Sequence, residues 1–114
     1  MPHDAEKFLE DMLDRAKFLV DLLRDKSADD LNCDRLTRSA VEREFSIIGE
    51  ALMQLHRSFP DIAEQIDQWQ RIIGFRHVLI HGYGILEMET IVNIAHSELP
   101  ILIGQIRALL QKLE

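Results

Sequence analysis

Residues that cross-link or interrupt a polypeptide are scarce in this chain, whose 114 residues include one cysteine, three prolines and five glycines. Because Cys33 is the single cysteine, an intramolecular disulfide and a cysteine-based zinc site are excluded within one chain. No apolar run is long enough to span a membrane, and the first residues lack the pattern of a signal peptide. We therefore expect a cytoplasmic protein.

Hydrophobic residues make up 46% of the chain and charged residues 29%, whereas aromatic residues contribute only 6%. This balance is typical of a folded, helix-rich chain and not of a disordered one. The length predicts a single domain over residues 1–114. A chain of this size buries roughly two-thirds of the surface that its unfolded form exposes, so one hydrophobic core is feasible without cross-links.

Apolar residues recur at spacings of three and four along most of the chain, which is the period of an amphipathic helix. In the second predicted helix this apolar stripe runs from Leu36 to Leu55. Residues 27–33 read as a polar connection before it. The pattern predicts an all-α fold, an up-and-down four-helix bundle with a short extra helix. The four long helices are expected at residues 4–26, 34–57, 69–81 and 86–113.

Proline and glycine mark the expected ends and bends of these helices. Proline disfavours helix at the residue before it, so the second helix should end before Pro60. Asp61 and Glu64 then resemble a capping box that starts the short extra helix. The Gly-Tyr-Gly sequence at residues 82–84 should end the third long helix. Pro100 should kink the last one, because proline lacks the donor for one backbone hydrogen bond.

The formal net charge of −7 argues against a nucleic-acid partner, since such partners usually need a basic surface. The acids are unevenly spread, however, and none occurs between Asp67 and Glu87. Two explanations stay open. The window is a surface that a polyanion can approach, or it is a buried helix, which would also lack acids. The basic and titratable residues in the window are Arg71, Arg76, His77 and His81.

Arg76 and His81 have the side chains that cleavage of RNA requires. Cleavage without a metal takes a proton from the 2′-hydroxyl and gives one to the leaving oxygen, and histidine can serve either role near neutrality. Arginine meets the charge on the phosphate oxygens with a planar fork of donors. The two residues lie about 140° apart around a helix, so they converge only across a groove or where the helix unwinds. Alternatively, Arg76 is a surface charge and His81 a residue favoured by the helix dipole.

His77 and His81 could instead be metal ligands, because residues four apart share one face of a helix. Val78 stands where the zinc motif H-E-x-x-H has its glutamate, and a third ligand is missing nearby. His56 and His96 could contribute only through the tertiary fold. We therefore expect no metal and no cofactor.

Glu50 is the acid of interest on the second predicted helix, where it follows the small residue Gly49 in a mostly apolar stretch. Two interpretations are open: Glu50 pairs with Arg76 and orients it, or it is an ordinary solvated charge. The larger aromatic residues are expected in the core and not in a base-stacking platform; they are Phe45, Phe75 and Trp69.

The spacing Arg76-x-x-x-x-His81-x-Tyr83 resembles the R-x-x-x-x-H-x-Y motif of HepT-like toxins in the HEPN superfamily. The similarity covers residues 5–110. It includes Val-Glu-Arg at 41–43, Ile-Ile-Gly-Glu-Ala at 47–51, the motif helix at 69–83 and Leu-Pro at 99–100.

The resemblance implies a metal-independent ribonuclease in which Arg76 and His81 act at a cleft between two subunits of a homodimer. The polar residue after the arginine is also used in the superfamily, where Asn or Asp is commoner than the His77 found here. His77 would therefore strengthen catalysis or merely conserve polarity. Two facing motif helices without acids would double the local positive charge for an RNA substrate.

The resemblance also implies an off-switch, as in type VII-like toxin–antitoxin systems. The partner is an MntA-type nucleotidyltransferase antitoxin, which transfers AMP to the motif tyrosine, here Tyr83. The added phosphodiester would occupy the place of the RNA phosphate and compete for Arg76. Gly82 replaces the acidic residue expected before the tyrosine, and it should make Tyr83 more mobile.

Two other functions are compatible with the same residues. The chain could be a non-catalytic helical partner that binds a nucleotide or substrate for a minimal nucleotidyltransferase, with Arg76 holding phosphate. It could also be a plain dimerisation bundle, in which Arg76 and His81 have no chemical role. Expression alone separates them from a toxin, because only the toxin should arrest growth.

Overall fold

The structure is a computed structural model that describes residues 3–81 and 87–114. The prediction that residues 82–84 end a helix, and every prediction about Tyr83, lies outside these residues. Within the described part there are seven helices and no strand, so the all-α prediction is confirmed. The helices are α1 (His3–Leu23), α2 (Ala28–Asn32), α3 (Arg35–Ser58), α4 (Pro60–Ala63), α5 (Trp69–His81), α6 (Met88–Ser97) and α7 (Leu99–Leu113).

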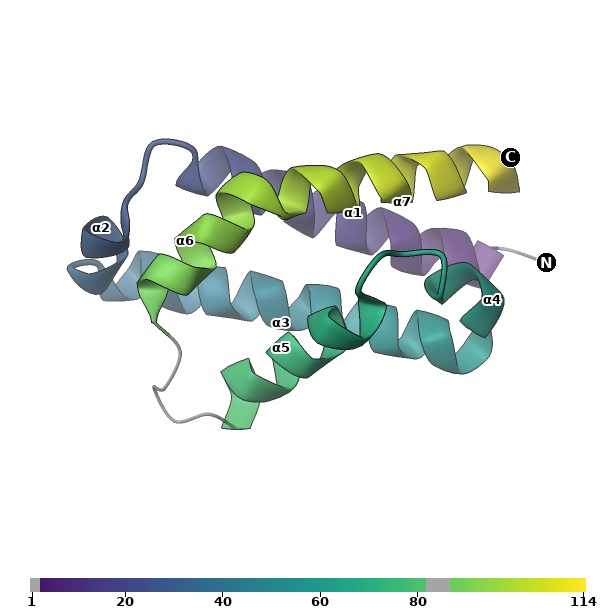
Figure 1. Ribbon diagram of the computed structural model, residues 1–114, viewed down its shortest axis with the longest axis horizontal. Helices are drawn as coiled ribbons and strands as arrows, with labels where there is room; N and C mark the ends of the chain where they lie inside the picture. Colours follow the sequence, from purple (N-terminus) through teal and green to yellow (C-terminus); the bar gives the residue numbers. More distant parts are fainter. Residues whose placement is uncertain (1–2, 82–86) are drawn as a thin grey trace.

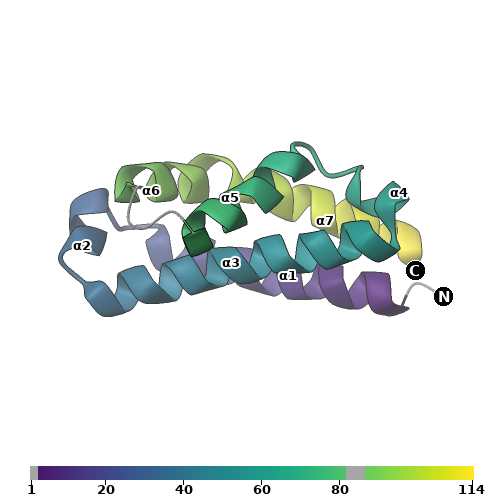
Figure 2. The ribbon, with the colours of Figure 1, turned by 90° about the horizontal axis from the view of Figure 1, so that it is seen from below.

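The long helices lie side by side along the length of the molecule (Figure 1). α1 packs against both α3 and α7, and α5 packs chiefly against α3. The view turned by 90° shows α5 crossing over α3 at an angle (Figure 2). The short helix α2 closes one end, where it contacts α6. This arrangement places α5, which carries most of the acid-free window, on the outside of α3.

The core is formed by the apolar stripes of α1, α3, α6 and α7. On α1 the buried residues recur every three or four positions, and α3 contributes the fully buried Leu52 and Leu55. The predicted stripe of α3 is wrong at its beginning, because Leu36 is 85% exposed. Among the described residues no polar or charged residue is buried. The stripes therefore face a core that is wholly apolar within the part that the structure describes.

The polar connection predicted at residues 27–33 is wrong, because most of it forms α2. Ser27 and Asp30 make a capping box: Asp30 N donates to Ser27 Oγ (3.3 Å) and Ser27 N donates to Asp30 Oδ2 (2.8 Å). The hydrogen bond from the Ser27 backbone lowers the pKa of Asp30. Leu31 is fully buried and anchors the short helix to the core.

The predicted capping box of Asp61 and Glu64 is also wrong. α4 begins with Pro60 in its first turn, where proline is favoured, and within the described part no side chain caps it. Glu64 instead contacts His56 Nε2 at 3.0 Å. The short helix is therefore started by the backbone angle of proline and not by a polar side chain.

The last predicted helix is two helices. α6 ends at Ser97 and α7 begins at Leu99, so that Glu98 separates them. Pro100 lies in the first turn of α7, where its missing N–H leaves no intrahelical hydrogen bond unmade. The kink expected in one long helix is therefore a break between two helices, and Figure 1 shows the change of direction between α6 and α7. None of the described helices combines the length and the apolar character that crossing a membrane requires.

Replacing Leu52 tests the core that the structure assigns. Leu52→Ala should lower the free energy of unfolding by about 2–5 kcal/mol, because it leaves a cavity where a fully buried side chain stood. Leu36→Ala on the same helix should change it by less than about 0.5 kcal/mol. Urea unfolding followed by circular dichroism, at equal protein concentrations, measures both. Equal losses would contradict the assignment.

Candidate active site

Arg76 extends from α5 onto α3, where its guanidinium meets Glu50. Arg76 Nη2 lies 2.9 Å from Glu50 Oε2, and the two side chains are 26% and 39% exposed. Of the two interpretations of Glu50, the structure shows the ion pair with Arg76. The pair is a contact between two helices, and its two residues are 26 positions apart in sequence.

The two charged groups touch without being aligned as a hydrogen bond. Glu50 Oε2 and Arg76 Nε are both buried atoms, and neither has a hydrogen-bond partner among the described residues. Charge attraction therefore holds Arg76 over α3, while the directional donors of the guanidinium are not saturated by Glu50. Because 26% of the Arg76 side chain remains exposed, a guanidinium held in this way can still reach an acceptor such as a phosphate oxygen.

Gln54 fixes the other oxygen of the same carboxylate. Its Nε2 donates to Glu50 Oε1 over 2.9 Å, from one turn further along α3. The two oxygens of Glu50 thus have separate partners, Gln54 for one and Arg76 for the other. Sequence reasoning missed Gln54, although its spacing of four from Glu50 is the helical spacing for such a pair.

Gly49 lies directly beneath the stem of Arg76. It is buried, and a Cβ built on it would stand 2.4 Å from Arg76 Cβ. Carbon atoms that are not bonded to each other normally stay about 3.5–4.0 Å apart. α3 therefore has no room for a side chain at the point where Arg76 crosses it.

His77 and His81 lie in the last part of α5. His77 is exposed. His81 is the last residue of the helix, so the backbone between Arg76 and His81 is helical and keeps the separation of about 140° around the axis. The side chain of His81 and all of Tyr83 lie outside the described residues. The structure thus places Arg76 and Glu50 together and leaves the rest of the motif as a prediction.

The acid-free window is not simply a buried helix. Among the described residues of α5, Gln70, Arg71, Gly74 and His77 are exposed. The opposite face packs on the core through partly buried hydrophobic residues that include Ile72 and Leu79. α5 therefore presents an outer face that carries basic or titratable groups and no acid.

The additional metal ligands considered from the sequence are engaged elsewhere. His56 contacts Glu64 and stacks on Trp69, with ring centroids 4.1 Å apart. The His96 ring donates from Nε2 to the Leu23 carbonyl over 2.7 Å. Within the described part no three His, Cys, Asp or Glu residues are grouped to hold a metal ion.

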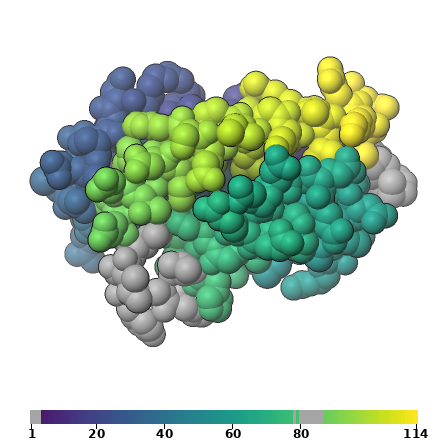
Figure 3. All heavy atoms as spheres, viewed as in Figure 1, coloured from purple at the N-terminus to yellow at the C-terminus, as the bar shows by residue number. Residues whose placement is uncertain are grey.

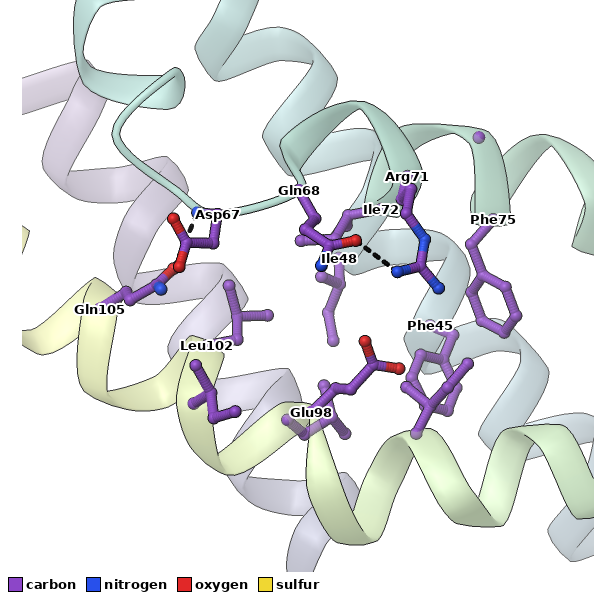
Figure 4. A pocket seen from close by; sticks show the side chains of 14 residues that line it. Phe45, Ile48, Asp67, Gln68, Arg71, Ile72, Phe75, Glu98, Leu102 and Gln105 are labelled. Carbon is purple, nitrogen blue, oxygen red and sulfur yellow. Dashed lines mark hydrogen bonds between the residues drawn. The ribbon is translucent and has the colours of Figure 1, made fainter.

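A groove of about 550 Å³ lies on the other flank of α5, between this helix and the junction of α6 and α7. Figure 3 shows α5 and the α6–α7 segment on this face of the molecule. Phe45 and Phe75 meet there edge to face, with ring centroids 5.4 Å apart. Arg71 is hydrogen-bonded to Gln68, and Glu98 points into the groove from the opposite side (Figure 4). Of the three aromatic residues expected in the core, Phe45 is buried there, and Phe75 and Trp69 are partly buried against it.

Comparisons with known proteins give the class of the chain. A family model described as "Ribonuclease HepT-like" matches residues 12–109. A candidate RNase of Methanocaldococcus jannaschii is 31% identical over 97% of this chain and 91% of its own length. A candidate RNase of Caldanaerobacter subterraneus is 31% identical over 92% and 93%, and the "Probable ribonuclease HepT" of Thermococcus cleftensis is 27% identical over 96% and 98%. No solved structure matches the chain significantly.

The fold and these matches together define an all-α endoribonuclease, an enzyme that cleaves RNA. The chain belongs to the HepT-like ribonuclease family of the HEPN superfamily.

A double-mutant cycle measures whether Glu50 and Arg76 interact as the structure shows. The variants are Glu50→Gln, Arg76→Met and their combination, read out by urea unfolding. We expect a coupling of about 1 kcal/mol, at the upper end for ion pairs, because the pair is only partly exposed to solvent. The exposed pair of Asp21 and Arg24, within α1, should give about 0.2–0.5 kcal/mol. No coupling for Glu50 and Arg76 would show that they do not meet in solution.

Proposed function

We propose that this chain is a metal-independent ribonuclease toxin of a type VII-like toxin–antitoxin system. It acts in the cytoplasm as a single domain over residues 1–114, folded as an up-and-down helical bundle. Arg76 and His81 cleave RNA, and AMP on Tyr83 switches the activity off. The observation that carries the proposal is the Arg76–Glu50 pair beside the acid-free face of α5, in a chain of a ribonuclease family.

The cleavage step assigns one role to each motif residue. The 2′-hydroxyl loses its proton and its oxygen bonds to the adjacent phosphorus, while the bond from phosphorus to the 5′-oxygen breaks. His81 transfers one of the two protons, removing that of the 2′-hydroxyl or giving one to the leaving 5′-oxygen, and solvent water exchanges the other. Arg76 stabilises the negative charge that grows on the phosphate oxygens. His77, which follows Arg76 and is exposed, assists as a polar residue.

Glu50 acts on Arg76 and not on the RNA. An arginine in solution samples many rotamers, and ordering it during the reaction would cost conformational entropy. The contact of 2.9 Å with Glu50, which Gln54 braces, orders the guanidinium before the substrate arrives. Positioning of this kind lowers the barrier because the ordering is already complete.

A homodimer explains how Arg76 and His81 cooperate although their positions are about 140° apart around one helix. Two copies of α5 facing each other across a two-fold axis bring the arginine of one subunit towards the histidine of the other. The facing surfaces carry no acid on the described part of α5, so they attract RNA despite the net charge of −7. The acids on other faces keep the protein soluble.

Substitution of the two motif residues tests the chemistry. His81→Ala should lower the RNA cleavage rate by about 10²- to 10⁴-fold, the usual contribution of general acid–base catalysis. Arg76→Ala should lower it by about 10²- to 10³-fold through lost charge stabilisation. Both should relieve growth arrest on expression. Arg107→Ala, on the exposed face of α7, is the matched control and should leave the RNA cleavage rate and the growth arrest unchanged.

Mixing the two inactive proteins then tests the shared cleft. If each cleft combines Arg76 of one subunit with His81 of the other, a heterodimer of the two variants has one complete site and regains activity. Light scattering should give the mass of a dimer. A monomer with full activity would contradict the dimer. A wild-type chain that is harmless and leaves RNA intact would instead favour a non-catalytic partner of the nucleotidyltransferase.

Modification of Tyr83 is tested by intact-mass spectrometry. Co-expression with an MntA-type nucleotidyltransferase should add one or more AMP units, because the tyrosine hydroxyl is the proposed acceptor. Fragmentation should map the added mass to Tyr83, and the cleavage rate should fall with the modified fraction. Tyr83→Phe, which lacks the hydroxyl, should keep its mass and remain active. An unchanged wild-type mass would indicate that the antitoxin acts by binding alone.

A further inference from the structure

Gly49 differs from the other described helical glycines in what surrounds it. A Cβ at Gly49 would lie 2.4 Å from Arg76 Cβ, 3.1 Å from its Cγ and 3.3 Å from its Cδ. At Gly74 and Gly104, no described atom beyond the neighbouring residues and backbone of the same helix would lie within 4 Å of such a Cβ. Glycine within a helix is unfavourable relative to alanine, so helix formation does not account for Gly49. The requirement comes from the neighbouring helix, and specifically from Arg76.

We propose that Gly49 is a positioning residue. Because it has no side chain, the stem of Arg76 can lie directly on the backbone of α3, and we call this position the seat of Arg76. The stem rests on the backbone of α3, and the guanidinium is thereby directed to Glu50, the next residue of that helix. Gln54, one turn further on, holds the carboxylate that receives it. One stretch of α3 thus supplies three residues that act on Arg76: Gly49 makes room for its stem, Glu50 pairs with its charge, and Gln54 holds Glu50 in place.

The contact is sensitive because it involves atoms that cannot move independently. The tip of an arginine can swing away from an obstacle, but its Cβ is fixed by the backbone of α5. An added methyl group at Gly49 must therefore push α5 away from α3 or rotate it. Either movement displaces the guanidinium from Glu50. A displacement of about 1 Å is enough to reduce a rate by about 10²-fold when the group must meet a developing charge.

The catalytic part of this inference rests on the proposed function, and Gly49→Ala tests it directly. We expect kcat for RNA cleavage to fall by about 10²-fold while KM stays near the wild-type value, since the misplaced arginine fails chiefly in the transition state. The assay is run at a temperature at which circular dichroism shows the variant to be folded. Gly104→Ala, an open glycine of α7, is the matched control and should keep the wild-type kcat.

Combination with Arg76→Gly provides a readout that does not require RNase activity. That substitution removes the Cβ against which the new methyl group would press. Gly49→Ala should lower the melting temperature in the wild-type background and leave it unchanged, or raise it, in the Arg76→Gly background. In the same background it should cause no further loss of kcat. A general folding defect would instead lower the melting temperature in both backgrounds.

The kcat values and the melting temperatures test two separate claims, that Gly49 positions Arg76 for catalysis and that Arg76 packs on Gly49. Wild-type cleavage of RNA with equal kcat for Gly49→Ala and Gly104→Ala overturns the positioning role. Equal melting-temperature losses from Gly49→Ala in both backgrounds overturn the seat itself. If the wild type cleaves no RNA, the proposed function fails and the catalytic role of Gly49 fails with it. The melting temperatures still decide whether Gly49 seats Arg76. Should Gly49→Ala alone not fold, a folded double variant supports the seat and an unfolded one contradicts it.

Discussion

α5 is held to the rest of the described protein chiefly by α3, and Arg76 crosses α3 at a point where a glycine leaves no side chain in its way. This crossing sets the distance between the two helices. It also brings the guanidinium of Arg76 to 2.9 Å from the carboxylate of Glu50, on a helix whose other face packs in the core. The packing of the domain and the placement of its candidate catalytic arginine therefore depend on the same contact, so a change that loosens one should disturb the other.

The periodic part of the fold could be predicted from the sequence because burial repeats with the helical period. α5 begins where the pattern predicted, and α1 and α3 differ from their predicted ranges by a few residues at most. The errors occur where local hydrogen bonding decides. α2 is too short to show a period, and it depends on the Ser27 and Asp30 cap and on burial of Leu31. The break at Glu98 depends on how α6 and α7 each pack, which Pro100 alone does not reveal.

The candidate site could be predicted only in part, because it is assembled from two helices. The motif spacing marked Arg76 and His81, and the acid beside a small residue marked Glu50 as one of two possibilities. Which possibility holds depends on how α5 lies on α3, which no single-helix pattern contains. The pattern identifies Gly49 only as a small residue, since its role depends on how closely the two helices approach: a Cβ added to Gly49 would stand 2.4 Å from Arg76 Cβ. Gln54, by contrast, could have been found from its spacing to Glu50.

The proposed cleavage chemistry requires that Arg76, held on α3, contacts the RNA phosphate. A crystal structure with an RNA oligonucleotide methylated at every 2′-hydroxyl tests it most directly, because such a strand binds but cannot attack its own phosphate. A guanidinium nitrogen of Arg76 should lie about 2.7–3.2 Å from a phosphate oxygen, with the stem of Arg76 still on Gly49. RNA bound along the Arg71 side of α5, with Arg76 in contact with Glu50 alone, would contradict it.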